Sequence, residues 1–444
     1  MLESTYLILL VFIAFIEIVR EKKNKFDFLT LFNIYFSLMY PLPGFLLALD
    51  FDNSASDLGL GVSLYTNNIQ TALAIFVGYF LVLLGFYSES AQKQGENIII
   101  KARGNNLIVF VYAILLLLFS CLAIYIYSSQ YGGFLNTLAK TALIRVQAVK
   151  GGNLVFFARL TLFSVFASYL FCSLVLIKKI KKARVILYLM FIFSVVVAFI
   201  ALTMTGGRAY LINYFLGFYL VYILKNKRVS WLAMALFVCF AALFLFYGKI
   251  LFFSLTGITE GYDAVSNRFV EAINTKSNDD FNFYNFMHNF HYPVHSLDVA
   301  FSKEYEFRWF IDFIYGFFSL IPERLFGAET PESIMYYNTR YIIGSNDVAI
   351  PTGFLAFSIY SMWWPGLIGF CFAYGWIGRY LQTILYKHIH NLFWMPFAYV
   401  TIAQMWMDFV GSDPETFLQG NFCSLIAILL FFFIASRVSV VRYI

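Results

Sequence analysis

Long apolar runs recur along the chain and are separated by shorter polar connections. About eleven of these runs are long enough to form helices, and they occupy residues 5–19, 28–49, 67–87, 107–127, 154–177, 185–204, 209–224, 229–253, 363–386, 392–411 and 421–437. An apolar run of ~20 residues crosses the hydrocarbon core of a bilayer as a helix, which satisfies its own backbone hydrogen bonds. The pattern therefore predicts an all-α polytopic membrane protein with about eleven transmembrane helices.

One connection, between the eighth and ninth runs, is much longer than the others. It covers residues 254–350 and is rich in Phe, Tyr, His and Trp, a composition that argues against disorder. Its apolar stretch at 308–321 is too short to cross a membrane, so it predicts an interfacial or re-entrant helix that ends at Pro322. We therefore predict three regions, which are eight helices in 1–253, one large loop with short interfacial helices in 254–350, and three helices in 351–444.

The distribution of basic residues predicts the orientation of the chain. Of the 31 Lys and Arg residues, 19 fall in one set of connections, at positions 20–25, 93–103, 178–184, 225–228, 379–387 and 437–442. Connections rich in Lys and Arg face the cytoplasm. We therefore expect the N-terminus and the long loop to lie outside the cytoplasm and the C-terminus to lie inside it.

Composition narrows the class of protein. The chain is 61% hydrophobic and 13% charged, whereas soluble domains average roughly 25% charged residues. This excludes a soluble enzyme and a disordered chain. The five cysteines all lie in apolar runs, and no nucleotide-binding loop or metal-binding motif occurs. We therefore expect no disulfide, no metal and no cofactor, and a partner that is the lipid bilayer rather than a nucleic acid.

Several basic residues oppose the orientation rule because they fall on the outward side. An arginine fork binds two phosphate oxygens at once, so these cations are candidate ligands for a lipid-linked pyrophosphate. The alternative is that each snorkels to lipid headgroups or pairs with an acid of its own loop. The candidates are Arg145, Arg159, Arg208, Lys249, Arg268, Arg324 and Arg340. Arg208 follows two glycines, whose backbone amides at a helix start could add to anion binding.

Candidate bases cluster in the long loop. His288, His291 and His295 fall within eight residues, and histidine is the usual general base near neutral pH. A metal site with nearby acids and simple hydrogen bonding at an interface are the alternatives. Glu323, beside Pro322, is a second candidate base. Charges inside the central runs are few, with Glu17 and Asp408 the deepest acids, which argues against an ion-driven transporter.

The layout and three short patches resemble a known family. The patches are Phe317–Gly327 (FFSLIPERLFG), Ile350–Gly353 (IPTG) and Trp364–Gly369 (WPGLIG). Together with about eleven spans and one long late loop, they resemble the Wzy-type O-antigen polymerases, the oligosaccharide repeat unit polymerase family. Some members carry Arg followed eleven residues later by Gly. Here Arg145, Arg208 and Arg340 are followed at that distance by Phe, Tyr and Pro.

The resemblance implies a membrane glycosyltransferase with a GT-C-like fold in the bacterial inner membrane. Its N-terminus would be periplasmic and its C-terminus cytoplasmic. It would join oligosaccharide repeat units carried on undecaprenyl pyrophosphate at the periplasmic face, and undecaprenyl pyrophosphate would leave. A Wzz-type chain-length regulator and a flippase would be its partners. The alternatives are an O-antigen ligase that transfers glycan to lipid A-core, a lipid-linked oligosaccharide flippase, and a membrane O-acyltransferase.

Overall fold

The computed structural model describes residues 2–22, 25–49, 68–103, 106–145, 154–177, 184–275, 287, 290–321, 332–344 and 349–440. Nearly all of its elements are helices. The prediction of an all-α polytopic membrane protein is confirmed at this level.

Within the described residues, nine helical segments are long and apolar enough to cross a membrane. They are α1 (Leu2–Val19), α2 (Phe28–Met39) with α3 (Pro41–Ala48), α4 (Ile69–Phe86) with α5 (Glu89–Glu96), α6 (Asn106–Ser129), α8 (Val155–Leu160) with α9 (Phe163–Val175), α10 (Arg184–Met204), α12 (Trp231–Ser254) with η2 (Leu255–Gly257), α18 (Gly353–Lys387) and α20 (Pro414–Ala435).

Two further predicted spans form helices that do not meet both requirements of length and apolar composition for crossing a membrane. They are α11 (Arg208–Asn226), which carries charge at both ends, and α19 (Met395–Asp408), which has only 14 residues before the short η6 (Phe409–Gly411). The count of eleven spans therefore stays a prediction. The remaining elements are α7 (Phe134–Arg145), α13 (Tyr262–Thr275), α15 (Tyr292–Ser302), α16 (Asp312–Phe318), α17 (Ile334–Ile343), β1 (Ile98–Ala102) and β2 (Ser436–Val440).

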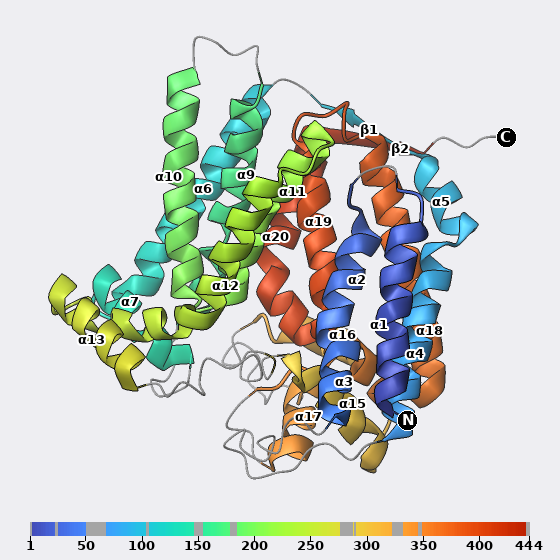
Figure 1. The fold of residues 1–444 in the computed structure, drawn as a ribbon. Helices are drawn as coiled ribbons and strands as arrows, with labels where there is room; N and C mark the ends of the chain where they lie inside the picture. The colour runs from blue at the N-terminus through green and yellow to red at the C-terminus, as the bar shows by residue number, and fades with distance from the viewer. Residues whose placement is uncertain are drawn as a thin grey trace.

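The helices form two groups joined by α19 and α20 (Figure 1). One group holds α1 to α5 and α18, and the other holds α6 to α12. Helix α19 contacts both α2 and α11, while α20 contacts α6, α8 and α9. The bundle therefore has a central seam, and α19 and α20 line it.

The two ends of the bundle differ. One end, the strand end, carries the antiparallel pair β1–β2, in which Ile98 lies opposite Val440. The other end, the loop end, carries α13, α15, α16 and α17 (Figure 1). The connections that the sequence predicts to be cytoplasmic, at 20–25, 93–103, 379–387 and 437–442, belong to the strand end where the structure describes them.

Helix α18 contains a chain reversal that the sequence pattern does not predict. Its backbone leaves the helical region at Met362 and Trp363, and Pro365 falls in the first turn of the second helical part. A side chain at Gly366 would collide with the carbonyl oxygen of Ser358, only eight residues earlier. In a straight helix these residues would lie ~12 Å apart, so the chain folds back. Residues 353–361 form a short helix packed against 364–387, and the second part matches the predicted span at 363–386.

The packing of α4 on α18 depends on small residues and aromatic rings. Side chains at Gly85 and Gly375 would each meet backbone atoms of the facing helix, so the two backbones touch. Beside them Tyr374 stacks on Trp406, with ring centroids 4.7 Å apart. The chain's high aromatic content is thus largely core packing.

A buried ion network closes the strand end of α1. Arg20 donates to Glu17 at 2.9 Å and to both carboxylate oxygens of Asp27 at 2.6 Å. Asp27 also caps α2 through a capping box with Thr30. The side chain of Arg20 is only 8% exposed, so these ion pairs are largely shielded from water.

Candidate functional site

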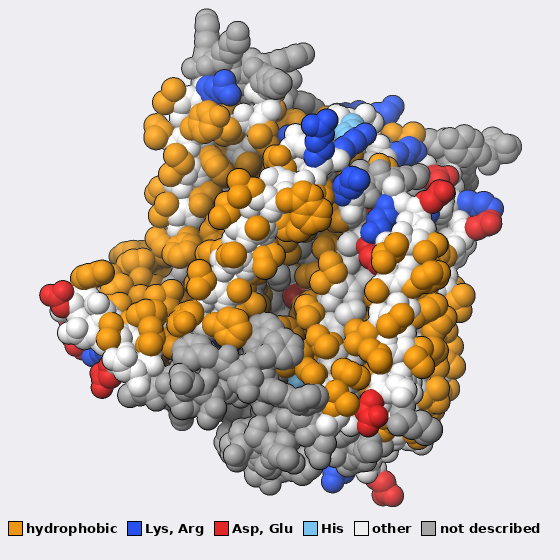
Figure 2. Space-filling view, viewed as in Figure 1, with side chains coloured by type: hydrophobic (Ala, Val, Ile, Leu, Met, Phe, Trp, Pro, Cys, Tyr) orange, Lys and Arg blue, Asp and Glu red, His pale blue; other side chains and the backbone are white. Residues whose placement is uncertain are grey.

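A small cavity lies where the second helix group meets α19 and α20. It has a volume of about 80 Å³ and is lined by α9, α10, α11, α19 and α20. Its polar members include Tyr210, Asn213, Gln404, Asp408 and Asn421. Figure 2 shows the hollow between the two groups, with an acidic side chain at its depth and hydrophobic side chains along its rims. A polar cavity within an apolar bundle is a candidate functional site.

Asp408 is the charged residue of this cavity. It ends α19, is half-buried, and accepts a hydrogen bond from Nδ2 of Asn421 at 3.1 Å. Its backbone carbonyl accepts from the hydroxyl of Ser412 at 2.9 Å. Gln404, one turn earlier, donates to the carbonyl of Asn213 at 2.7 Å and so ties α19 to α11. The carboxylate is thereby held by two helices at a fixed place.

A second polar row runs along the adjoining face of α20. Glu415, Gln419 and Cys423 are spaced four residues apart and so share one face. Gln419 donates to Glu415 at 2.7 Å, and the Cys423 thiol donates to the carbonyl of Arg159 at 3.0 Å. Glu415 is buried, with 5% of its surface exposed.

Arg159 brings a positive charge to this row. It lies on α8, is half-buried, and donates to the carbonyl of Ser319 at 3.3 Å. Gln419, which donates to Glu415, also donates to the hydroxyl of Ser319 at 3.4 Å, so Arg159 and Glu415 belong to one hydrogen-bond network. Helix α20 connects the two polar groups, because it carries both Glu415 and Asn421, the partner of Asp408. We call Arg159, Tyr210, Asp408, Glu415 and Asn421 the seam site.

Asp413 holds the turn that positions the seam site. It caps α20 by accepting from the amide of Thr416 at 2.9 Å, and it accepts from the amide of Thr352 at 3.4 Å. Nearby, the hydroxyl of Tyr292 donates to the carbonyl of Gly411 at 2.8 Å. The loop between α19 and α20 is therefore tied to α15 and to the start of α18. Burial raises the pKa of Asp413 to about 6.

This shift predicts a pH-dependent stability. Because the folded protein favours the protonated acid, the contribution of Asp413 is complete below pH ~4 and is lost as the pH rises through ~6. Thermal denaturation in detergent measures this effect. Between pH 4 and 8, the free energy of unfolding of Asp413→Asn should rise by roughly 3 kcal/mol relative to that of the parent protein. The exposed Asp263→Asn should track the parent at every pH, and a gain of the same size there would refute the assignment.

The predicted arginines and lysine separate into distinct surroundings. Of the predicted cations whose side chains the structure describes, Arg159 is the one that joins the seam site. Arg208 donates to the carbonyl of Leu245 and packs on α12, while Lys249 is an exposed residue of α12. Arg268 pairs with Glu260 at 2.6 Å, and Arg340 pairs with Glu332 at 3.1 Å.

For Arg268 and Arg340 these ion pairs match the alternative interpretation of pairing within the loop, and a role in anion binding stays a prediction. Arg145 ends α7, and its side chain is outside the described part of the chain. Arg324, Glu323 and His288 also lie outside the described residues.

The two described histidines of the cluster lie on α15. The helix begins at Tyr292 with Pro293 in its first turn, which places His291 and His295 four residues apart on one face. Their rings are 6.1 Å apart, and the residues are 2% and 3% exposed. Neither lines the seam cavity. Among the described residues, no three His, Cys, Asp or Glu side chains are grouped closely enough to hold a metal ion. Their role as general bases stays a prediction.

An aromatic groove of about 700 Å³ lies at the loop end. Its walls include Phe307, Trp309, Phe310 and Tyr337 around Arg308, which binds both carboxylate oxygens of Asp312 at 2.7 Å. Trp309 and Phe310 have φ of 51° and 58°, a strained backbone for such residues. Such strain is kept where the surroundings impose it and is common at binding sites. The amide of Trp309 donates to Ser361 at 2.9 Å and helps to impose it.

The sequence alone indicates part of the seam site. It marks Asp408 as a deep acid and Arg159 as an outward cation, but the analysis of apolar runs misses Glu415 and Asn421. The available signal is the sequence Ser412–Glu415 (SDPE), in which an Asp followed by Pro begins a helix. The predicted span starts only at residue 421, so this polar first turn falls in a predicted loop.

Comparison of the chain with protein-family models, curated proteins and solved structures gives no match.

Proposed function

We propose that the protein is a bacterial inner-membrane glycosyltransferase that extends a glycan carried on undecaprenyl pyrophosphate, as an O-antigen polymerase does. The observation that carries the proposal is the seam site. It combines a half-buried cation, Arg159, with the buried carboxylate of Glu415 on α20, and the same helix, through Asn421, holds the carboxylate of Asp408 beside a cavity with apolar rims. A lipid-linked pyrophosphate sugar needs this combination of apolar access, cation and base.

Each residue has a distinct role in the proposed reaction. The acceptor sugar hydroxyl attacks the anomeric carbon of the donor, and the bond from that carbon to the pyrophosphate oxygen breaks. Asp408 takes the hydroxyl proton as general base. Arg159 stabilises the negative charge that develops on the departing pyrophosphate. Asn421 holds the carboxylate of Asp408 in place through its hydrogen bond.

The aromatic groove supplies a surface for the glycan. Trp309 is 66% exposed and Phe307 is 47% exposed, although both lie beside the charged Arg308. Aromatic faces with adjoining charged groups suit the apolar face and hydroxyls of a sugar. We place the acceptor repeat unit here, at the loop end, which the basic residues predict to be periplasmic. A chain-length regulator would act from the same side.

A transport function is the second candidate because one observation favours it. Asp408 and its amide partner line a cavity inside the bundle, and ionisable groups inside membrane bundles mark transport pathways. A lipid-linked oligosaccharide flippase would use such a seam. The O-antigen ligase shares the donor and stays the third candidate.

A deletion of the gene, with and without a plasmid copy, separates these functions. Gel electrophoresis of the lipopolysaccharide is expected to show core with one repeat unit, and the plasmid should restore the ladder. A bare core with accumulated lipid-linked polymer would instead identify a ligase. A bare core without polymer would identify a flippase, and an unchanged ladder would contradict all three.

A further inference from the structure

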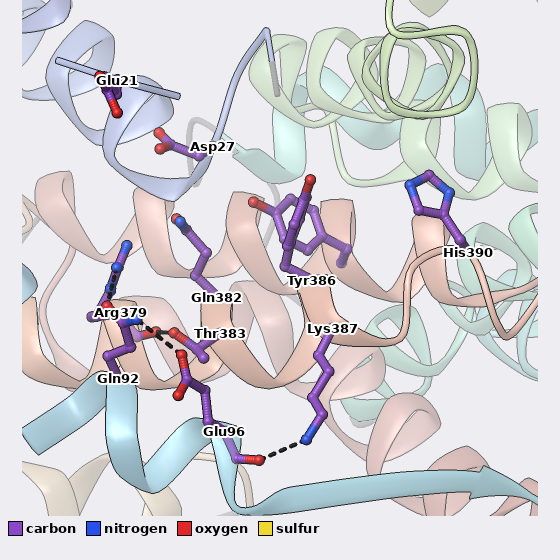
Figure 3. Close-up of a pocket in the computed structure, with 11 residues that line it drawn as sticks. Glu21, Asp27, Gln92, Glu96, Arg379, Gln382, Thr383, Tyr386, Lys387 and His390 are labelled. Carbon is purple, nitrogen blue, oxygen red and sulfur yellow. Dashed lines mark hydrogen bonds between the residues drawn. The ribbon is translucent and has the colours of Figure 1, made fainter. Parts of the chain in front are cut away.

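A second cavity lies at the strand end and shares no lining residue with the seam cavity. It has a volume of about 520 Å³, which is the size of a small-molecule pocket. Its walls come from the last turns of α18, from α5, and from the connection between α1 and α2 (Figure 3). The proposed glycan chemistry makes no use of it.

Hydrogen bonds fix the walls of this cavity. Arg379 donates to the side-chain oxygen of Gln92 at 2.6 Å, and Lys387 donates to the backbone carbonyl of Glu96 at 2.6 Å (Figure 3). Trp376 donates to Ser90 at 2.9 Å. Helix α5 is thereby held on α18, and the cavity is formed before any ligand arrives.

Charges of both signs surround the cavity. Its basic members are Arg379, Lys387 and His390, and its acidic members are Glu21, Asp27 and Glu96. Asp27 is already neutralised by Arg20. Within the described part of the chain, no carboxylate lies within ion-pair distance of Arg379, which bonds to the Gln92 amide and lies 5.6 Å from the Phe86 ring centroid.

The acids lie across the cavity from one another. In Figure 3 Glu21 lies on the α1 side of the cavity and Glu96 on the α5 side, with Arg379 of α18 between them. Glu96 accepts one hydrogen bond from Gln92 at 2.9 Å, and Glu21 is exposed. The site therefore presents one guanidinium without a carboxylate partner, flanked by carboxylates.

We propose that this cavity binds the headgroup of a zwitterionic phospholipid, phosphatidylethanolamine. Arg379 would bind the phosphate, because a guanidinium matches two phosphate oxygens. The exposed Glu21 would bind the ammonium group, since Glu96 already accepts a hydrogen bond from Gln92. The cavity lies at the ends of the membrane-spanning helices α1 and α18, which is the depth of lipid headgroups. An anionic lipid offers no cation to the carboxylates of the cavity, Glu21 and Glu96.

Thermal shift of the purified protein tests the proposal. Short-chain phosphatidylethanolamine added in dodecyl maltoside should raise the Tm in a saturable way, and phosphatidylglycerol with the same acyl chains should do so less. Arg379→Gln should raise the half-saturating concentration about tenfold. The matched control Arg437→Gln removes an exposed arginine at the same end that does not line the cavity, and should leave that concentration unchanged.

A second variant still tests the proposal if Arg379→Gln fails to fold. Glu21→Gln alters an exposed side chain and should narrow the difference between the two lipids while leaving the lipid-free Tm unchanged. Equal shifts from both lipids in the parent protein would overturn the proposal. So would an Arg379→Gln variant that responds like Arg437→Gln.

Discussion

Replacing Asp408 with asparagine should stop glycan extension while the protein stays folded. If Asp408 is the general base, the loss in rate should be about 10²- to 10⁴-fold. Asparagine keeps an oxygen that accepts from Asn421 but cannot take a proton, so the hydrogen bond survives and the chemistry does not. The measurement is the length of polymer formed by the purified protein from lipid-linked repeat units, together with the lipopolysaccharide ladder in cells.

Two controls separate catalysis from folding. Asp263→Asn changes an exposed acid on α13 and should leave the ladder intact. His291→Gln tests the alternative base, since His291 lies on α15 and does not line the seam cavity. If Asp408→Asn still produces a full ladder and His291→Gln does not, then His291 is the general base and Asp408 is not. Gel filtration and Tm of each variant show whether the fold is kept.

The membrane-spanning helices could be predicted from the sequence because each depends on local composition alone. An apolar run of sufficient length indicates a helix whatever surrounds it. The reversal in α18 escapes prediction because the predicted span begins at residue 363, and hydropathy carries no direction that would place residues 353–361 alongside it. The decisive feature is the backbone at Met362 and Trp363, where φ of Trp363 is 57°.

The seam site is harder to predict because its contacts join distant parts of the chain. Arg159 and Ser319 are 160 residues apart, and Gln404 and Asn213 are 191 apart. No spacing rule links such residues. The pairing of Arg268 with Glu260 is easier to predict, because the two residues are only eight positions apart. Pairing with an acid of the same loop is also the alternative that the sequence analysis gives for these cations.

The buried ion network at the strand end should be sensitive to loss of its central charge. Arg20→Met leaves Glu17 and Asp27 facing each other without their shared cation, which should cost about 3–5 kcal/mol. Lys22 also pairs with Glu17, at 2.5 Å, but its side chain is 21% exposed. The matched variant Lys22→Met should therefore cost about 1 kcal/mol or less. Thermal denaturation in detergent measures both.

A triple variant shows whether the penalty comes from charge or from lost packing. Combining Arg20→Met with Glu17→Gln and Asp27→Asn removes the uncompensated carboxylates, and asparagine can still cap α2. It should recover most of the stability lost by Arg20→Met, since replacing a whole buried ion group is far less costly than breaking it. If the triple variant is no more stable than Arg20→Met, the arginine acts by packing its side chain. If Arg20→Met is no worse than Lys22→Met, the network adds little to the fold.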